Sequence, residues 1–113
     1  MTRSTANWPD FDAAWDFSDP AGTEATFRAF LEDHPGAPAD WILELKTQIA
    51  RARGLQRDFD AAHDLLDEVE TNLGGREVTR VRYLLERGRV FNSAGEPERA
   101  RSFFEEAFEL AKQ

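Results

Sequence analysis

The segment from Leu84 to Ala111 constrains the fold of this 113-residue chain more than any other stretch of its sequence. Gly95 can adopt a positive φ, and Pro97 suits the first turn of a helix. After this pair, small and aromatic residues recur at the spacing of one helix face; they are Ala100, Phe103, Phe104, Ala107, Phe108 and Ala111. The segment therefore predicts two helices joined by a tight turn.

A glycine lies inside the first of these two helices. The apolar face of that helix consists of Val78, Val81, Leu84, Leu85 and Phe91, and Gly88 interrupts it. Glycine in a helix interior costs about 1 kcal/mol relative to alanine, and such a glycine usually marks close packing. We expect close helix packing at Gly88.

These residues resemble the signature of the tetratricopeptide repeat, a unit of two helices. The first helix of that unit carries a large apolar residue, a glycine and an aromatic residue, and the second carries an alanine and an aromatic residue. In this chain the corresponding residues are Leu84, Gly88, Phe91, Ala100 and Phe104. Arg87 departs from the signature, which has leucine before the glycine.

An earlier copy of this pattern lies at a constant offset along the chain, the repeat offset, which takes Ala50 to Gly88. The same offset puts Arg57 in the place of the turn glycine. In the second helix, Ala62, Leu66 and Val69 correspond to Ala100, Phe104 and Ala107. The repeat offset exceeds the usual period of about 34 residues, and we assign the surplus to the connection over residues 72–76. The resemblance covers about residues 41–112.

The resemblance implies an all-α fold, a right-handed superhelical stack of antiparallel helix hairpins. Residues 1–18 are predicted to form a flexible acidic-aromatic segment, and residues 19–113 the helical domain. About five helices are expected, because Asp19 and Pro20 form a cap and first-turn pair for a leading helix ahead of the hairpins. Their ranges are 20–33 for the leading helix, 40–73 for the first hairpin and 77–112 for the second.

The net charge of −8 is distributed unevenly along the chain. Residues 41–57 and 76–95 each carry a net charge of +3, whereas residues 58–75 carry −6. The first helix of each hairpin is therefore basic. In proteins with this repeat the first helices line a concave groove, so the resemblance implies a locally basic groove and a protein-binding scaffold.

Helical phase selects the candidate groove residues, which lie opposite the apolar faces of their helices. They are Glu44, Gln48, Arg51, Arg82, Glu86, Arg89 and Ser93. Guanidinium groups repeated along a groove suit bidentate binding of carboxylates, which predicts a protein or acidic-peptide partner. The alternative is a solvated face on which Arg82, Glu86 and Arg89 pair with one another.

The run from Trp8 to Phe17 combines aromatic and acidic residues. Trp8, Phe11 and Trp15 are spaced so that they could form one face of a short helix that covers the end of the helical stack. The alternative is that the run docks in trans on the basic helices of a neighbour. If the run covers the stack, deleting residues 1–17 should lower the stability of the fold. If it docks in trans, the deletion should abolish association and leave the fold stable.

The last helix has an apolar face wider than one-sided packing requires. Phe103, Phe108 and Leu110 extend this face and form a candidate self-association edge. Repeat arrays need covered ends, so a homodimer through this helix is a second prediction. The alternative function is accordingly a self-associating structural module, whose groove or edge is filled by its own N-terminal segment or by a second copy.

The sequence shows no pattern of reaction chemistry. It has no cysteine, no phosphate-binding glycine loop and no nucleophile or metalloprotease motif, and His63 with Asp67 is better explained as part of an acidic helix than as a metal site. We therefore expect no catalytic residue, metal or cofactor. The acidic charge argues against nucleic-acid binding. No apolar stretch is long enough to cross a membrane, and a cytoplasmic location is expected.

Overall fold

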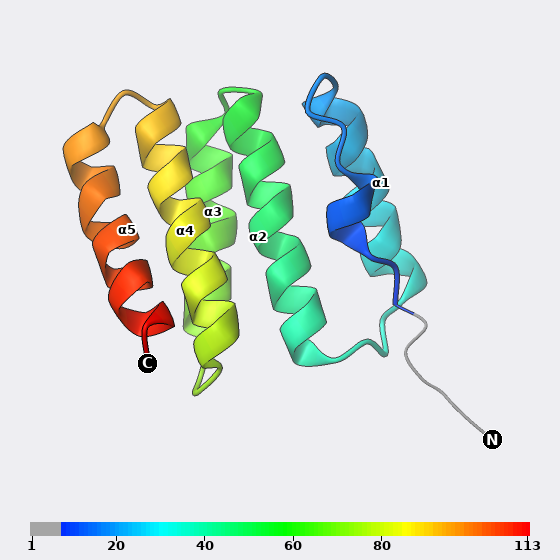
Figure 1. Cartoon of the computed structure of the whole chain (residues 1–113). Coiled ribbons are helices and arrows are strands. Elements are labelled where there is room, and N and C mark those ends of the chain that lie inside the picture. Colours follow the sequence, from blue (N-terminus) through cyan, green and yellow to red (C-terminus); the bar gives the residue numbers. More distant parts are fainter. Residues whose placement is uncertain (1–7) are drawn as a thin grey trace.

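The computed structural model describes residues 8–113, and within this range it contains five α-helices and one short 3₁₀ helix, without any strand (Figure 1). The elements are η1 Phe11–Ala14, α1 Pro20–Asp33, α2 Ala39–Leu55, α3 Phe59–Thr71, α4 Glu77–Ser93 and α5 Pro97–Ala111. The prediction of an all-α fold with about five helices is confirmed. Residues 1–7 of the predicted N-terminal segment lie outside the described residues.

Local sequence signals explain where several elements begin. The side chain of Asp19 accepts a hydrogen bond from the backbone N–H of Gly22 at 3.0 Å, and Asp58 accepts one from Ala61 at 3.3 Å. These aspartates cap α1 and α3 by satisfying free N–H groups of the first turn. Pro20 and Pro97 occupy first-turn positions of α1 and α5, where a missing N–H costs nothing.

The two helix hairpins repeat each other in backbone detail. The repeat offset takes both ends of α2 onto the corresponding ends of α4, and the closing turns of the two hairpins share one hydrogen-bond pattern. The N–H of Asp58 donates to the carbonyl of Arg53 at 3.0 Å, and the N–H of Glu96 donates to the carbonyl of Phe91 at 2.9 Å. Each turn contains a residue with positive φ, 65° at Arg57 and 82° at Gly95. The offset recognised in the sequence is therefore a structural repeat.

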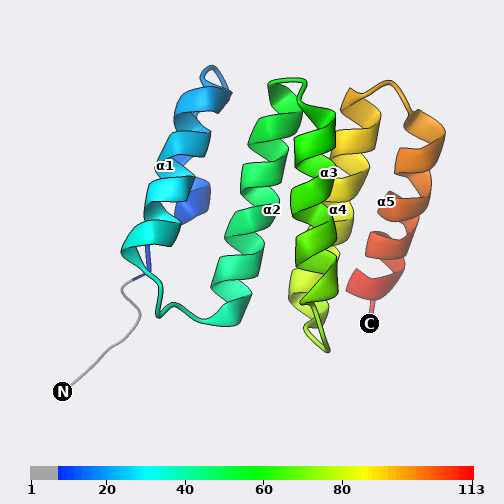
Figure 2. The same cartoon turned by 180° about the vertical axis from the view of Figure 1, so that it is seen from behind.

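The hairpins lie side by side across the molecule (Figures 1 and 2). α2 packs on α3 and α4 packs on α5, while α2 also contacts α4 and α1. Gly88 permits the close approach of α4 and α5, since a Cβ atom there would lie 2.6 Å from the Phe104 ring. At the corresponding place in the first hairpin, Ala50 is fully buried. Small residues on the first helices thus bring the second helices near.

Two apolar clusters form the core. The larger one joins α2, α3, α4 and α5 and includes Leu66, Tyr83 and Leu84. The smaller one joins α1, α2 and η1 through Phe11, Phe27, Leu45 and Ile49. η1 is thereby tied to the helical stack.

The N-terminal segment differs from the flexible segment that the sequence predicted, because its residues 8–18 lie against α1 and α2 (Figure 1). Phe11 is only 6% exposed and makes edge contacts with the rings of Phe27 and Trp41. The Trp41 indole also donates a hydrogen bond to the carbonyl of Pro9 at 3.1 Å. Burial of the aromatic side chains holds the segment in place despite its acidic composition. This arrangement agrees with the interpretation that the segment covers the end of the helical stack.

The candidate self-association edge on α5 is only partly available. The Phe103 ring stacks on Phe91 with centroids 5.5 Å apart, and Leu110 packs against the larger core cluster. Phe108 is 65% exposed. Two of the three predicted edge residues therefore pack within the chain, Phe103 on α4 and Leu110 on the larger core cluster.

Candidate functional site

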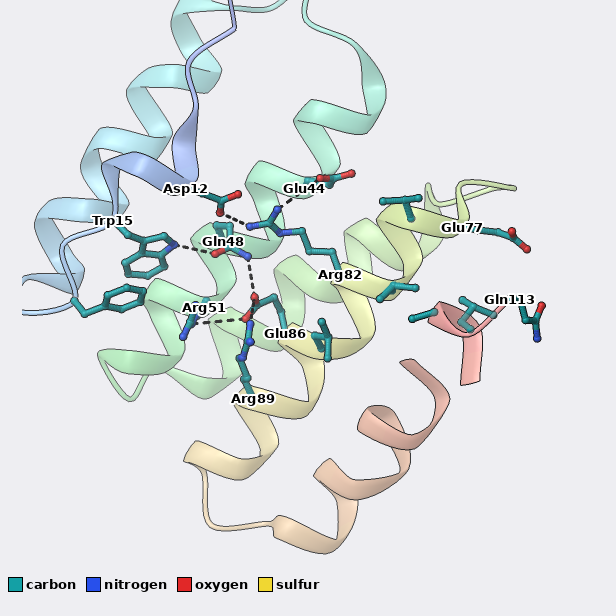
Figure 3. A pocket seen from close by; sticks show the side chains of 16 residues that line it. Asp12, Trp15, Glu44, Gln48, Arg51, Glu77, Arg82, Glu86, Arg89 and Gln113 are labelled. Carbon is teal, nitrogen blue, oxygen red and sulfur yellow. Dashed lines mark hydrogen bonds and ion pairs between the residues drawn. The ribbon is translucent and has the colours of Figure 1, made fainter. Parts of the chain in front are cut away.

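A groove with a volume of about 850 Å³ crosses the first helices of both hairpins (Figure 3). Its floor comes from α2 and α4. Trp15 and Phe17 of the N-terminal segment close one end, and Leu110 and Ala111 of α5 close the other. Six of the seven predicted groove residues line it. Ser93 lies instead in an adjoining hollow of about 180 Å³, which Arg51 and Arg89 also line.

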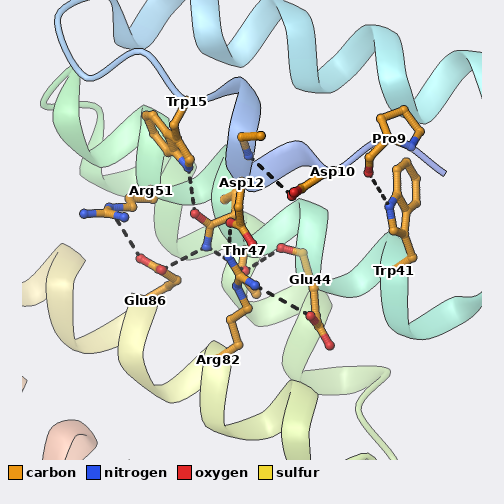
Figure 4. A network of polar contacts seen from close by, with 12 residues as sticks. Pro9, Asp10, Asp12, Trp15, Trp41, Glu44, Thr47, Arg51, Arg82 and Glu86 are labelled. Atoms are coloured by element: carbon orange, nitrogen blue, oxygen red, sulfur yellow. Dashed lines mark hydrogen bonds and ion pairs between the residues drawn. The ribbon is translucent and has the colours of Figure 1, made fainter.

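Gln48 and Glu86 are the main correction to the predicted site, because each is only 1% exposed. The sequence predicts a groove-lining stripe opposite the apolar faces of the two helices, but α2 and α4 pack so that Gln48 and Glu86 lie between them while still lining the groove. The indole N–H of Trp15 donates to Gln48 Oε1 at 2.8 Å, and Gln48 Nε2 donates to Glu86 Oε2 at 2.9 Å (Figure 4). These hydrogen bonds connect the N-terminal segment through α2 to α4.

Arg51 and Arg89 share the Glu86 carboxylate, whereas Arg82 pairs with other residues. Arg89 Nη1 donates to Glu86 Oε2 at 2.6 Å. Arg82 pairs with Asp12 of the N-terminal segment, and its Nη1 lies 3.8 Å from Glu44 Oε1. Of the ion pairs in the solvated-face alternative, the structure contains the one between Glu86 and Arg89, whereas Arg82 pairs across elements. The arginines therefore hold the groove wall together as well as lining it.

The charge of the groove also differs from the prediction of a basic surface. Its lining includes Arg51, Arg82 and Arg89, together with the carboxylates of Asp12, Glu44, Glu77 and Glu86. Positive charge is concentrated at one end only, where Arg51 and Arg89 share Glu86 and line the adjoining hollow. Burial lowers the pKa of Arg51 from its ordinary value, the Glu86 carboxylate opposes this effect, and the guanidinium groups of Arg89 and Arg82 add to it.

Apolar side chains occupy the other part of the groove. Val78 is 80% exposed, and Val81, Leu85 and Leu110 lie beside it in the lining. Phe17, at the opposite end, is 56% exposed. The groove thus joins an aliphatic end near α5 to an aromatic and guanidinium end near the N-terminal segment. Asp12, Trp15 and Phe17 also line the groove. They were not among the predicted groove residues, although the alternative function places the N-terminal segment in the groove or at its edge.

A second polar network, missed in the sequence, surrounds Arg87. This residue is 6% exposed; its Nη2 donates to Asp67 at 2.6 Å and its Nη1 lies 2.9 Å from His63 Nδ1. Burial and the Arg87 guanidinium lower the pKa of His63, so the ring is held as a neutral acceptor. The position of Arg87 beside Gly88 on the packed face was the available signal. His63 and Asp67 thus bind an arginine of the same chain.

The described residues contain no group of three or more potential metal ligands. Within them, every helix is too short or too polar to cross a bilayer. The site is thus a groove built from side chains of α2, α4, α5 and the N-terminal segment. Comparisons with protein-family models, with curated proteins and with solved structures each found no match, so the groove itself is the basis for inferring a function.

Proposed function

We propose that this chain is a non-catalytic scaffold with tetratricopeptide-like hairpins, and that it binds a segment of a protein partner in the groove over α2 and α4. The observation that carries the proposal is the exposure of Phe17 and Val78. Both are large apolar side chains that stay more than half exposed, and both line this one groove. Exposed apolar groups gathered in a concave surface are typical of interaction sites.

The lining also indicates the chemistry of the partner. The aliphatic end favours an apolar side chain, which would cover Val78 and Val81. At the other end, Arg51 and Arg89 have one carboxylate between them, that of Glu86. Their remaining N–H groups suit a carboxylate of the partner. The groove therefore favours an acidic peptide that also carries apolar residues.

Selection from a random peptide library on the full chain tests this proposal. Selected peptides should bind in titration calorimetry and should lose about tenfold or more in affinity to an Arg51→Ala/Arg89→Ala variant, as interface hot spots do. Val78→Asp should weaken them as well, because it places a charge at the apolar end. An Arg99→Ala/Arg101→Ala variant removes the same charge from α5 and serves as the control. Equal binding to the groove variants and the control would refute the proposal.

Self-association is a second candidate, favoured by the exposure of Phe108. This ring lies beside a hollow of about 450 Å³ that Phe104 also lines. A second copy that covered α5 would bury both rings. Light scattering should then give a dimer mass for the wild-type chain and a monomer mass for Phe108→Ser, whereas a monomer mass for both would exclude it.

A further inference from the structure

We propose that the stacked rings of Trp15 and Phe17 position Arg51, holding its guanidinium away from the buried Glu86 carboxylate so that its N–H groups remain available in the groove. The inference deepens the proposed function and rests on it, because the ligand concerned is the acidic group of the partner. The two rings are nearly parallel, with centroids 4.5 Å apart and an interplanar angle of 5°.

The position of Arg51 shows that these rings hold its guanidinium. The Arg51 Cζ atom lies 4.8 Å from the Phe17 centroid and 5.4 Å from the Trp15 centroid, within the range of a cation–π contact. Its Nε lies 3.9 Å from Glu86 Oε1, which is beyond hydrogen-bond distance. Glu86 and the ring pair therefore compete for one guanidinium.

Glu86 has an oxygen that could accept a hydrogen bond from Arg51. Its Oε2 accepts hydrogen bonds from Gln48 and Arg89. Its Oε1 is buried and has no hydrogen-bond partner among the described residues. An unsatisfied buried carboxylate oxygen is unfavourable, and a small movement of Arg51 would satisfy it. Arg51 nevertheless stays on the rings.

The ring pair can act in this way because the N-terminal segment is anchored. Trp15 donates its indole N–H to Gln48, and Phe11 is buried in the smaller core cluster. Displacing the segment would expose that cluster, so Trp15 and Phe17 form a fixed wall of the groove. Phe17 itself is 56% exposed, which allows its ring to be changed without opening the core.

Cation–π contact and anion binding are compatible on one guanidinium. A ring attracts the cation through its π face, whereas a carboxylate binds the N–H groups of a guanidinium in their plane. The side chain of Arg51 is 28% exposed, and Arg89 lines the same end of the groove. A carboxylate can therefore reach both arginines while Arg51 stays on the rings. If Arg51 instead formed a hydrogen bond with Glu86, fewer of its N–H groups would be available to a carboxylate of the partner.

The first experiment examines the ligand-free protein by recording the Arg51 Nε–H signal in NMR spectra, assigned with Arg51→Lys. In Phe17→Ala, the Nε–H should exchange more slowly with water, because Arg51 closes on Glu86. The exchange rate is the readout, since loss of the Phe17 ring current changes the chemical shift by itself. Phe17→Tyr keeps an aromatic face and should reproduce the wild-type signal. Circular dichroism establishes that each variant is folded. Identical Arg51 Nε–H exchange rates in all three proteins would overturn the inference.

The second experiment uses glutarate as a dicarboxylate probe at constant ionic strength. Its apparent affinity, followed by the same signal, should fall about two- to fivefold in Phe17→Ala, the change expected for one exposed cation–π contact, and should be restored in Phe17→Tyr. Unchanged affinity in Phe17→Ala would contradict the role of the ring. If glutarate shifts none of the proteins while their ligand-free Arg51 Nε–H exchange rates differ, positioning by the rings is supported and carboxylate binding by the groove is contradicted.

Discussion

Replacing Gly88 by alanine tests the close contact between α4 and α5. The added Cβ would lie 2.6 Å from Phe104 Cε1, 2.8 Å from Cδ1 and 2.9 Å from Cζ. Carbon atoms in optimal contact are about 3.5–4.0 Å apart, so the ring would have to retreat by roughly 1 Å. Overpacking of this kind costs about 1–3 kcal/mol, whereas alanine gains about 1 kcal/mol in helix propensity. We expect Gly88→Ala to lower the free energy of unfolding by about 1 kcal/mol.

The first hairpin supplies the matched comparison, since Ala50 and Leu66 occupy the corresponding positions. In a Phe104→Leu background the clash is absent, and Gly88→Ala should therefore stabilise the protein by about 1 kcal/mol through helix propensity alone. The two substitutions should couple by about 2 kcal/mol, which is within the range seen for residues in contact. Urea denaturation of the four proteins, followed by circular dichroism, measures this coupling. The same effect of Gly88→Ala in both backgrounds would refute the packing argument.

Three further predictions concern the turns and the buried ionisable groups. Arg57 has a φ of 65°, and Arg57→Gly should raise the free energy of unfolding by about 0.5 kcal/mol, the relief of left-handed strain less the entropy of glycine; a lower urea midpoint would contradict this. Because the pKa of His63 is lowered in the fold, stability should fall as pH drops below the ordinary histidine value of about 6.5, and His63→Gln should flatten this loss between about pH 7 and 5. Burial raises the pKa of Glu24, but hydrogen bonds from Gln56 and Arg28 and the charges of Arg53 and Arg28 outweigh it and lower the pKa. The Glu24 carboxylate should therefore stabilise the fold above its ordinary pKa, and this stabilisation should be lost as pH falls through the lowered value. Glu24→Gln should have a free energy of unfolding lower by about 1–3 kcal/mol at neutral pH. In urea titrations at acidic pH, this variant should not show the loss of stability that the wild-type chain shows.

The elements of the fold could be predicted because their signals are local. Asp19 with Pro20 marks the start of α1, and the repeat offset relates α4 to α2 through short-range spacing of small and apolar residues. These patterns depend on neighbours within one or two helical turns. The positions of the turns at Arg57 and Gly95 followed from the same comparison.

The polar interior of the groove could not be predicted in this way. Which side of α4 faces α2 depends on how the two helices are rotated against each other, and this rotation decided that Gln48 and Glu86 are buried. The contacts of the N-terminal segment are also distant in sequence. Trp15 and Gln48 are 33 residues apart, and Asp12 and Arg82 are 70 residues apart. Periodicity carries no information about such pairs.

The buried Arg87 distinguishes two hairpins that are otherwise alike. Its counterpart in the first hairpin is Ile49, so only α4 carries a guanidinium at this position. On α3 it finds His63 and Asp67, but at the place of His63, α5 has Arg101. If the second helices exchanged places during folding, Glu105 would stand at the place of Asp67, but Arg101 would replace the neutral His63 and put a second cation beside the buried guanidinium. The buried charge of Arg87 thus disfavours this exchange and favours the observed pairing of α4 with α3.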